Sequence, residues 1–332
     1  SAQAVEQSGI DMEKIDADRF GVTIGSGVGG FITMESGIIK MHEKGPKRVP
    51  PMFVPMAIGN MAAGNTAIKF GAKGPSMDIV TACASATNSI GEAFRSIKHG
   101  YADLMLAGGA EATVCEIGIA GFAALTALST STDPDRASIP FDKERNGFVM
   151  GEGAGILMLE NLDHALERGA NILAEVVGYG VTCDAYHMTA PSADGSGAGK
   201  AMLQAMKEAG ITPSQVDYIN AHGTSTAAND SGETAAIKYA FGEEAYNVAI
   251  SSTKSMTGHL LGAAGGIEAV ACVKAIQDDF MPPTIGFQVA DEGCDLDYIP
   301  NVGREKEVTY TLSNSLGFGG HNAVLCFKKW EA

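Results

Sequence analysis

The stretch Asp78-Ile79-Val80-Thr81-Ala82-Cys83-Ala84-Ser85-Ala86-Thr87-Asn88-Ser89-Ile90-Gly91-Glu92-Ala93-Phe94-Arg95 decides how the rest of the chain is interpreted. Ile79 and Val80 indicate a short apolar strand that turns abruptly into a helix, with small residues around one cysteine. The first turn of a helix offers unpaired backbone N–H groups and the positive end of the helix dipole. Both stabilise a thiolate, so we expect the pKa of Cys83 to lie below that of a free cysteine. The alternative is a buried structural cysteine, because cysteine packs as a small hydrophobe.

The composition favours a large layered fold in a reducing compartment. Hydrophobic residues make up 45% of the 332 residues and charged residues 19%, which supports a sizeable core. Six widely separated cysteines form no C-x-x-C pair, and this argues against a disulfide scaffold or a zinc module. No signal peptide opens the chain, and no apolar run approaches the ~20 residues that span a membrane. We therefore expect a cytoplasmic protein without a membrane partner.

The charge balance limits the partners. A net charge of −16 argues against nucleic acid, because phosphate binding needs a positive field. One basic cluster interrupts the acidic background, at Lys40, Lys44, Lys47 and Arg48. A solvated loop is the default interpretation of such a run.

Strands and helices alternate along the chain. Apolar runs predict strands at residues 19–25, 102–109, 155–160, 172–179, 216–221, 247–251, 308–314 and 323–328, and helices at 53–70, 161–169, 196–210, 230–241 and 262–278. Continuous apolar strands of this kind are typical of parallel sheets covered on both faces. The pattern restarts near Asn171, and the segment from Lys254 to His259 runs into a small-residue helix as the Cys83 segment does. The sequence therefore predicts a duplicated α/β unit, with halves at 1–170 and 171–332 and the site between them.

Three histidines are candidates for chemistry, although a lone histidine is usually structural. His222 follows a strand directly, where open α/β sheets place their ligand sites, and His259 lies at a helix start. His321 follows a glycine-rich loop, and we interpret it as structural. Cys83, His222 and His259, each at a strand end, favour a shared site.

Dinucleotide-binding, serine-nucleophile and zinc motifs are each incomplete or absent in this sequence. The G-x-G-x-x-G match at residues 25–30 lacks the acidic residue that a dinucleotide site needs about 20 positions later. A serine nucleophile elbow would require glycine where Ala227 stands. No H-E-x-x-H motif or metal-spaced cluster is present, so zinc catalysis is not expected.

Five motifs together resemble the β-ketoacyl-acyl-carrier-protein synthases, the elongating condensing enzymes of the thiolase superfamily, and among them most closely the synthase II type. They run in order along the whole chain: Thr81-Ala82-Cys83-Ala84, the stretch from Phe141 to Gly155, Asn220-Ala221-His222-Gly223-Thr224-Ser225-Thr226, Lys254-Ser255-Met256-Thr257-Gly258-His259, and Asn314-Ser315-Leu316-Gly317-Phe318-Gly319-Gly320-His321-Asn322. The resemblance implies a thiolase-like, duplicated, five-layered αβαβα fold and a homodimer. Relatives begin with a longer N-terminal part, so we expect that part to be missing here.

The resemblance implies an acyltransferase of fatty acid biosynthesis that performs a decarboxylating Claisen condensation. Acyl-ACP and malonyl-ACP would give 3-oxoacyl-ACP, carbon dioxide and free carrier protein (ACP). Cys83 would carry the acyl chain as a thioester, which splits one hard step into two. His222 and His259, as neutral imidazoles, would donate N–H groups to the enolate oxygen. The N–H groups of Cys83 and Phe318 would form a second oxyanion hole, with Phe318 also gating the acyl chamber.

The remaining roles also come from the resemblance. Lys254 would act electrostatically, held by Glu268 or Glu233. No cofactor is expected, since the phosphopantetheine arm arrives on the carrier protein, and the substrate-binding positions would be Thr189, Thr224, Thr226 and Phe122. Carrier-protein docking would use Lys47 and Arg48. Positions that in relatives can hold a structural monovalent cation correspond to Asn220, Glu233, Glu268, Ser313 and Asn314.

Four alternatives stay open at this stage. One is a discrete polyketide ketosynthase. Another is a degradative thiolase, which would need a second catalytic cysteine, but Cys326 sits inside an apolar strand pattern. A non-catalytic partner subunit would lack the nucleophile that Cys83 supplies. The last is an inactive truncated product.

Overall fold

The computed structural model describes residues 1–331 of the chain, and it contains two main sheets, both of them mixed. The first has the order β2-β1-β3-β4 and is built from β1 (Phe20–Gly25), β2 (Ser76–Met77), β3 (Leu104–Glu111) and β4 (Gly153–Glu160). The second has the order β5-β11-β10-β6-β7 and is built from β5 (Glu175–Cys183), β6 (Tyr218–Asn220), β7 (Ala249–Ser251), β10 (Tyr310–Gly317) and β11 (His321–Lys328). A small pair, β8 (Phe280–Met281) and β9 (Arg304–Glu305), lies apart from them.

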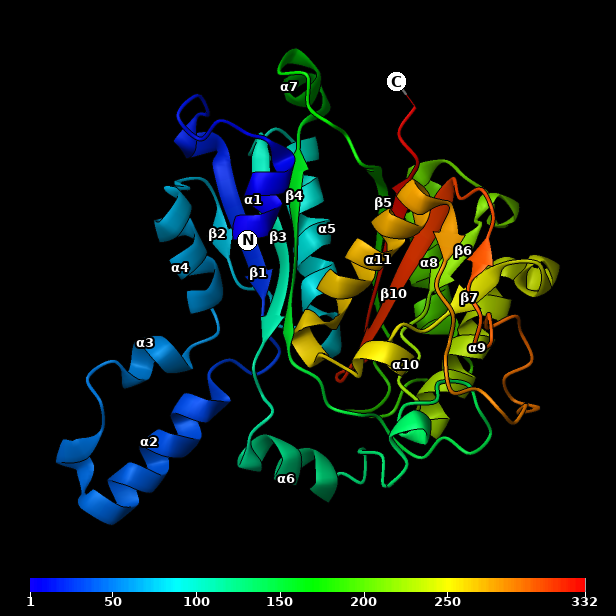
Figure 1. Cartoon of the computed structure of the whole chain (residues 1–332), viewed down its shortest axis with the longest axis horizontal. Coiled ribbons are helices and arrows are strands. Elements are labelled where there is room, and N and C mark those ends of the chain that lie inside the picture. Colours follow the sequence, from blue (N-terminus) through cyan, green and yellow to red (C-terminus); the bar gives the residue numbers. More distant parts are fainter. Residues whose placement is uncertain (332) are drawn as a thin grey trace.

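Helices and sheets alternate in five layers, which confirms the α/β fold class (Figure 1). The central layer holds α5 (Ser85–Lys98) and α11 (Ala264–Asp278), which contact both each other and the two sheets. One outer layer contains α1 (Ala2–Ser8) and α4 (Met61–Phe70), and the other contains α8 (Ser196–Ala209) and α9 (Ala227–Phe241). The remaining helices are α2 (Phe31–Lys44), α3 (Phe53–Ala57), α6 (Glu116–Ala124), α7 (Leu162–Glu167) and α10 (Lys254–Thr257).

The two halves repeat one topology. The strands β2-β1-β3-β4 have the same order and the same directions as β7-β6-β10-β11, and β5 has no counterpart in the first sheet. Before α5 and before α11 the chain makes the same short 3-10 turn, with a non-glycine residue at positive φ in each: Ala82 at 50° and Leu261 at 49°. The similarity between the Cys83 and His259 segments in the sequence therefore reflects one repeated turn.

The expectation of parallel sheets is confirmed for β1 with β2 and β3 and for β6 with β7 and β10, and it was wrong for the other pairs of the two main sheets. β4 runs antiparallel to β3, and β11 runs antiparallel to both β10 and β5. A continuous apolar run indicates that both faces of a strand are covered, but it carries no information on strand direction. The strand expected at Ile79 and Val80 was also wrong, because pairing with β1 is confined to Ser76 and Met77.

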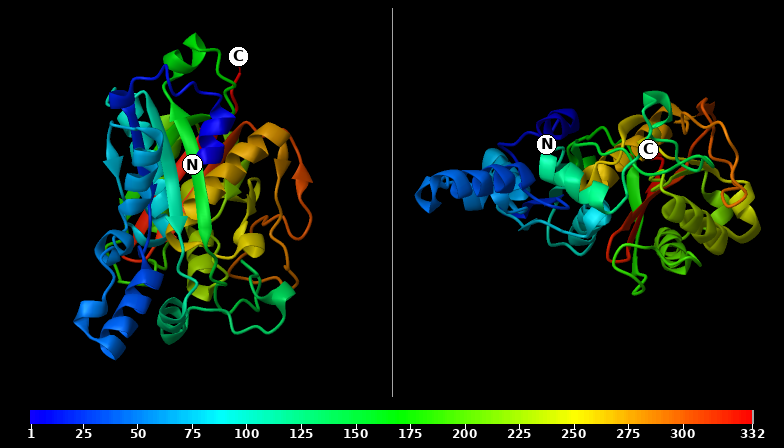
Figure 2. Two further views of the ribbon diagram at one scale, coloured as in Figure 1. Left: turned by 60° about the vertical axis from the view of Figure 1, so that its left-hand side comes forward. Right: turned by 90° about the horizontal axis from the view of Figure 1, so that it is seen from below.

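The segment that contains α2 and α3 stands apart from the layered body. α2 and α3 project from the body as an arm that Figures 1 and 2 show in blue, away from the second sheet. The helix expected at 53–70 is broken between α3 and α4, at residues 58–60. Among the described residues, no helix combines the length and the apolar character needed to cross a bilayer.

Candidate active site

The structure brings Cys83, His222 and His259 together. The sulfur of Cys83 and a ring nitrogen of each histidine all lie within 4.8 Å of one another. The two imidazole rings are 5.2 Å apart and nearly perpendicular, at 86°. The nucleophile candidate thus comes from the first half of the chain and both imidazoles from the second.

A tight turn presents the cysteine. Cys83 lies in the 3-10 turn Ala82–Ala84 directly before α5, next to the strained Ala82. Ser85 locks the turn, because its hydroxyl donates to the carbonyl of Ala82 at 2.7 Å and accepts from the amide of Thr81 at 2.9 Å. The end of β10 packs on this turn: a methyl group added to Gly317 would lie 3.3 Å from the amide nitrogen of Cys83. Phe318 follows immediately in the chain and lines the same cavity as Cys83.

Both histidines are buried and held by their backbones. Each is 2% exposed. The amides of His222 and Gly223 donate to the two carboxylate oxygens of Glu233, both at 2.8 Å. The amide of His259 donates to the carbonyl of Val149 at 2.7 Å.

Donors around the rings fix their tautomers. Nδ1 of His222 lies 3.4 Å from the ammonium of Lys254, and Nδ1 of His259 accepts from the amide of Leu261 at 3.3 Å. We therefore assign the ring hydrogen to Nε2 in both histidines. Burial, together with the positive charge of Lys254, lowers the pKa of both imidazoles well below the usual value. Each ring is thus a neutral N–H donor at neutral pH.

Lys254 is buried against Glu268. The ammonium donates to the Glu268 carboxylate and to the carbonyl of His222, the latter at 2.6 Å. The two side chains are 1% and 0% exposed. Of the two partners that the sequence left open, Glu268 pairs with the lysine, while Glu233 binds the amides beside His222.

The prediction of an acidic Cys83 was wrong. Burial raises the pKa of the Cys83 thiol to about 12, despite the opposing charge of Lys254. The residue is only 9% exposed, so the thiolate loses most of its hydration. Desolvation disfavours the charged form more than a helix terminus favours it here.

A cavity of about 400 Å³ leads to the three groups. All four predicted substrate-binding residues line it, namely Phe122, Thr189, Thr224 and Thr226, and so does Phe318, which was predicted for the oxyanion hole and the gate. The hydroxyls of Thr224 and Thr226 are 2.9 Å apart, whereas Thr189 lies on an exposed loop and interacts with His187. Phe318 is 36% exposed, and its neighbour Gly319 donates to the carbonyl of Met188 in that loop.

Two residues of this site were not singled out in the sequence. Phe148 lines the cavity and makes edge contacts with Phe122 at 5.4 Å and with His259 at 5.2 Å. Glu111, 4% exposed, accepts from the amides of Gly27 at 2.7 Å and Gly262 at 2.9 Å, and so joins the turns of the two halves. Neither has a spacing signal, because both depend on contacts between distant segments. His321 does not line the cavity.

Four of the five predicted cation residues have a buried side-chain oxygen that lacks a hydrogen-bond partner in the described part of the chain. These are Oδ1 of Asn220, Oε2 of Glu268, Oγ of Ser313 and Oδ1 of Asn314. Ser313 and Asn220 are register partners on β10 and β6. Oxygen ligands of this kind suit a hard cation. Glu233 fits less well, since its two oxygens already accept from backbone amides and from Asn314.

The predicted docking residues lie on the arm. Lys47 and Arg48 are exposed in the short turn Pro46–Arg48 that follows α2, and neither lines the cavity. Any role for them therefore concerns a partner's surface rather than the reacting atoms.

Comparisons with known proteins agree with this arrangement. The family described as "Beta-ketoacyl synthase, N-terminal domain" matches residues 1–165, and "Beta-ketoacyl synthase, C-terminal domain" matches residues 173–288. The chain is 55% identical over 332 residues to a 3-oxoacyl-[acyl-carrier-protein] synthase 2 from Synechocystis sp., covering 100% of this chain and 80% of that protein. The corresponding protein of Staphylococcus aureus is 55% identical over 330 residues, covering 99% and 80%.

Solved structures give the same result. A type II PKS ketosynthase, solved in complex with its acyl-carrier protein and bound to the hexaketide, superposes with a TM-score of 0.96 at 40% identity, covering 98% of this chain and 82% of that chain. A β-ketoacyl synthase from Burkholderia phymatum superposes with a TM-score of 0.89 at 37% identity, covering 96% and 77%. With both family domains matched and relatives of this identity aligned over its whole length, the chain belongs to the β-ketoacyl synthase family.

Proposed function

We propose that this chain is a condensing acyltransferase that joins acyl-ACP to malonyl-ACP, giving 3-oxoacyl-ACP, carbon dioxide and free carrier protein in fatty acid elongation. The observation that carries the proposal is the group of one sulfur and two neutral imidazoles within 4.8 Å at a 400 Å³ cavity. Relatives named 3-oxoacyl-[acyl-carrier-protein] synthase 2 support the same activity. Residues 1–170 would supply the nucleophile, and residues 171–332 the imidazoles.

In the first step, the sulfur of Cys83 attacks the thioester carbon of acyl-ACP. The new bond joins that carbon to the cysteine sulfur, the bond to the pantetheine sulfur breaks, and the thiol proton passes to the departing thiolate. The amides of Cys83 and Phe318 would stabilise the tetrahedral oxyanion, and the close packing of Gly317 on the Cys83 turn supports this. A pKa of about 12 keeps the thiol protonated until substrate arrives.

In the second step, malonyl-ACP loses carbon dioxide and its thioester oxygen becomes an enolate. The Nε2–H groups of His222 and His259 would donate to that oxygen, a role that their lowered pKa values support, because neutral rings retain one donor each. The enolate carbon then attacks the acyl thioester on Cys83. The carbon–sulfur bond breaks, and the cysteine thiolate regains a proton from solvent.

The cavity walls suit a pantetheine arm and an acyl chain. We propose that Thr189, Thr224 and Thr226 hydrogen-bond the arm, and that Phe122 contacts the acyl chain. Phe318, part-exposed at the cavity, would act as the gate.

Intact mass measurement after incubation with acyl-ACP tests the proposal. The chain should gain one acyl group, and the Cys83→Ala variant should gain none. That variant should still decarboxylate malonyl-ACP, because this step needs only the imidazoles. An acyl group found on another cysteine, or unchanged malonyl-ACP after incubation with the unmodified chain, would refute the assignment.

A discrete polyketide ketosynthase is the second candidate. It is favoured by the TM-score of 0.96 to a type II PKS ketosynthase, whereas the higher sequence identity, 55% against 40%, favours fatty acid elongation. Offering saturated acyl-ACP and poly-β-ketoacyl-ACP in competition separates them. Preferential extension of the saturated chain supports elongation, and preference for the polyketone supports the alternative.

The carrier protein is a proposed partner, docking at Lys47 and Arg48. Both are exposed cations on a chain of net charge −16, so they offer local attraction for an acidic surface. The charge-reversed double variant Lys47→Glu/Arg48→Glu should raise the KM for malonyl-ACP and leave the KM for malonyl-pantetheine unchanged. Lys207→Glu, on α8, is the matched control. Equal effects on both substrates would exclude docking at this turn.

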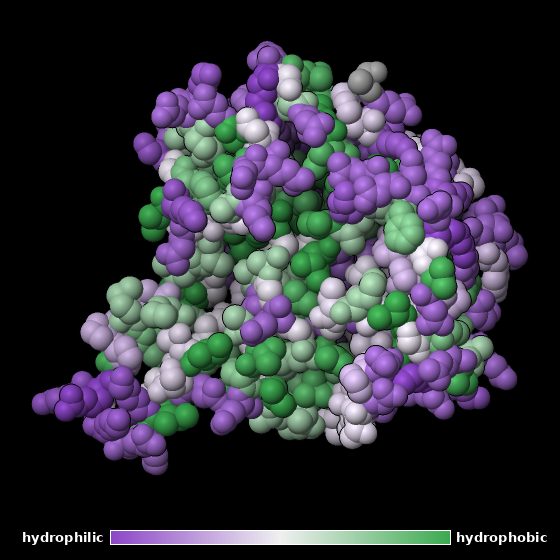
Figure 3. Space-filling model, in the orientation of Figure 1, coloured by the Kyte–Doolittle hydropathy of each residue, from purple (hydrophilic) through white to green (hydrophobic). Residues whose placement is uncertain are grey.

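We propose a homodimer that buries the arm and the edge strand β2. Large apolar side chains are exposed there and on the neighbouring α4: Ile38 at 57% and Val54 at 61% on the arm, Ile68 at 79% on α4, and Val80 at 58% shortly after β2. Figure 3 has green, apolar surface between the body and the purple tip of the arm. Exposed apolar area of this kind is typical of interfaces. Sedimentation of the chain and of a Val54→Asp/Ile68→Asp variant tests this, since the variant should be monomeric.

A further proposal concerns a bound cation. A monovalent cation would be held by Asn220, Glu268, Ser313 and Asn314, with Glu233 nearby, and their unpartnered oxygens support it. Potassium should then raise the Tm above its value in tetramethylammonium at equal ionic strength, and Ser313→Ala should reduce the difference.

We also propose a cytoplasmic location, which is supported by six unpaired thiols among the described residues.

A further inference from the structure

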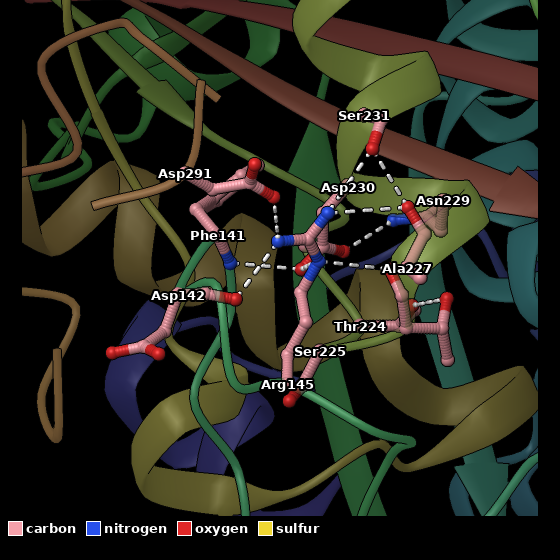
Figure 4. Close-up of polar contacts among 12 residues, drawn as sticks. Phe141, Asp142, Arg145, Thr224, Ser225, Ala227, Asn229, Asp230, Ser231 and Asp291 are labelled. Atoms are coloured by element: carbon pink, nitrogen blue, oxygen red, sulfur yellow. Dashed lines mark hydrogen bonds and ion pairs between the residues drawn. The ribbon is translucent and has the colours of Figure 1, made fainter. Parts of the chain in front are cut away.

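One guanidinium is enclosed behind the cavity wall. The side chain of Arg145 is 3% exposed, and Figure 4 shows it pointing into a ring of acceptors. An arginine carries five N–H donors in a rigid plane. Here each nitrogen is used: Nε faces the carbonyl of Thr226, Nη1 binds the carbonyl of Asp142 and the carboxylate of Asp291, and Nη2 binds the carbonyl of Ala227 and the hydroxyl of Ser231.

These acceptors come from three distant segments. Nη1 lies 2.8 Å from the Asp142 carbonyl oxygen and 2.5 Å from Oδ2 of Asp291. Nε and Nη2 lie 3.3 Å from the carbonyl oxygens of Thr226 and Ala227, at the start of α9. The residue therefore ties the loop of residues 139–147 and the loop around Asp291 to the segment that carries the threonines of the cavity.

Each of the two loops that Arg145 joins, around Ser225 and at residues 139–147, contains a residue with strained backbone. Ser225 has a φ of 69° and Phe141 a φ of 64°, a region that side chains rarely adopt. The two loops brace each other: the amide of Ile139 donates to the Ser225 hydroxyl and the amide of Gly147 to the Ser225 carbonyl, both at 3.0 Å. The amide of Phe141 donates to the buried Asp230 at 2.8 Å. Strained backbone of this kind persists only where its surroundings over-determine it.

We propose that Arg145 is a positioning residue that sets Thr224 and Thr226 in place for the pantetheine arm of the substrate. The inference deepens the proposed function and rests on it. Arg145 does not line the cavity, whereas both threonines do, with their hydroxyls 2.9 Å apart on either side of Ser225. The guanidinium acts on them through the carbonyl of Thr226 and the turn at Ser225.

The chemistry requires arginine at this place. A lysine ammonium keeps the charge that faces Asp291 and Asp230, but it has three donors on one atom and cannot reach all the acceptors spread around the edge of the guanidinium plane. Arg145→Lys therefore separates the geometric contribution from the charge. Arg145→Met removes both.

Steady-state kinetics with malonyl-ACP and the rate of Cys83 alkylation, measured in parallel, test the proposal. For Arg145→Lys we expect the KM for malonyl-ACP to rise at least tenfold, with a smaller fall in kcat and an unchanged alkylation rate. The same rise in KM with a smaller fall in kcat is expected with malonyl-pantetheine, because the threonines would contact the pantetheine arm. Arg168→Met is the control, because it breaks a two-bond ion pair with Glu160, at 2.6 Å for each bond, in the first half of the chain.

Hydrogen exchange supplies a readout that does not need activity. In Arg145→Lys, amides of residues 222–229 should exchange at least tenfold faster, while those of β10 stay unchanged. Should Arg145→Met fail to fold, Ser231→Ala, which removes one acceptor, should give a smaller shift in the same peptide. An unchanged KM and unchanged exchange in Arg145→Lys would overturn the inference. Absence of condensation by the unmodified chain would refute the proposed function instead, and hydrogen exchange would still test whether Arg145 holds the segment of residues 222–229.

Discussion

Replacing Lys254 by methionine removes the buried cation of the site. Its ammonium and the Glu268 carboxylate are 1% and 0% exposed, so the substitution leaves a carboxylate without hydration and without its partner. Removing one member of a buried ion pair costs about 3–5 kcal/mol of stability. The lost hydrogen bond to the His222 carbonyl, at 2.6 Å, places the expected loss toward the upper end.

The loss should depend on pH. The charge of Lys254 lowers the pKa of Glu268, which burial raises, so without the lysine the folded-state pKa rises further above the unfolded value of 4.5. The folded state then binds the proton more tightly than the unfolded state, so stability falls as pH rises from the unfolded pKa to the folded pKa. The deficit should therefore be smaller at pH 5 than at pH 8.

Urea unfolding at both pH values measures this, with Lys254→Met/Glu268→Leu as the matched variant. The double variant removes the stranded carboxylate and should recover about 2 kcal/mol or more at pH 8, since well-packed apolar pairs replace buried ion pairs at little cost. A single variant within 1 kcal/mol of the unmodified chain at pH 8, or a deficit equal at both pH values, would refute the reasoning.

The other predictions concern the reacting groups. Lys254→Met should raise the pKa of His222, because it removes a cation, and so shift the acid limb of the malonyl decarboxylation profile to higher pH; an unmoved limb would contradict the assigned contact. His259→Ala should slow decarboxylation by about 10²–10³-fold, as for other oxyanion donors. With a pKa near 12, Cys83 should alkylate at a rate that still rises through pH 9, and exposed Cys183 should react first in peptide mapping. A plateau for Cys83 below pH 8 would show a thiolate at neutral pH.

The sequence predicted correctly those features that depend on residues close to one another along the chain. The small residues around Cys83 mark the turn that presents it, and the alternation of strands and helices indicated the layered α/β class and its repeat. Those features depend on neighbours along the chain, so a single sequence displays them. The antiparallel direction of β4 and β11 was missed, because an apolar run between helix layers looks the same in either orientation.

The sequence by itself thus determined the family, the repeated unit and which sulfur and imidazoles would meet. Only the tertiary structure decided that Glu268 rather than Glu233 holds Lys254, that Phe148 and Glu111 belong to the site, and that burial raises the pKa of Cys83. The reason is physical: ion-pair choice and desolvation depend on how segments from both halves enclose a point in space, and residue spacing along the chain contains no measure of that enclosure.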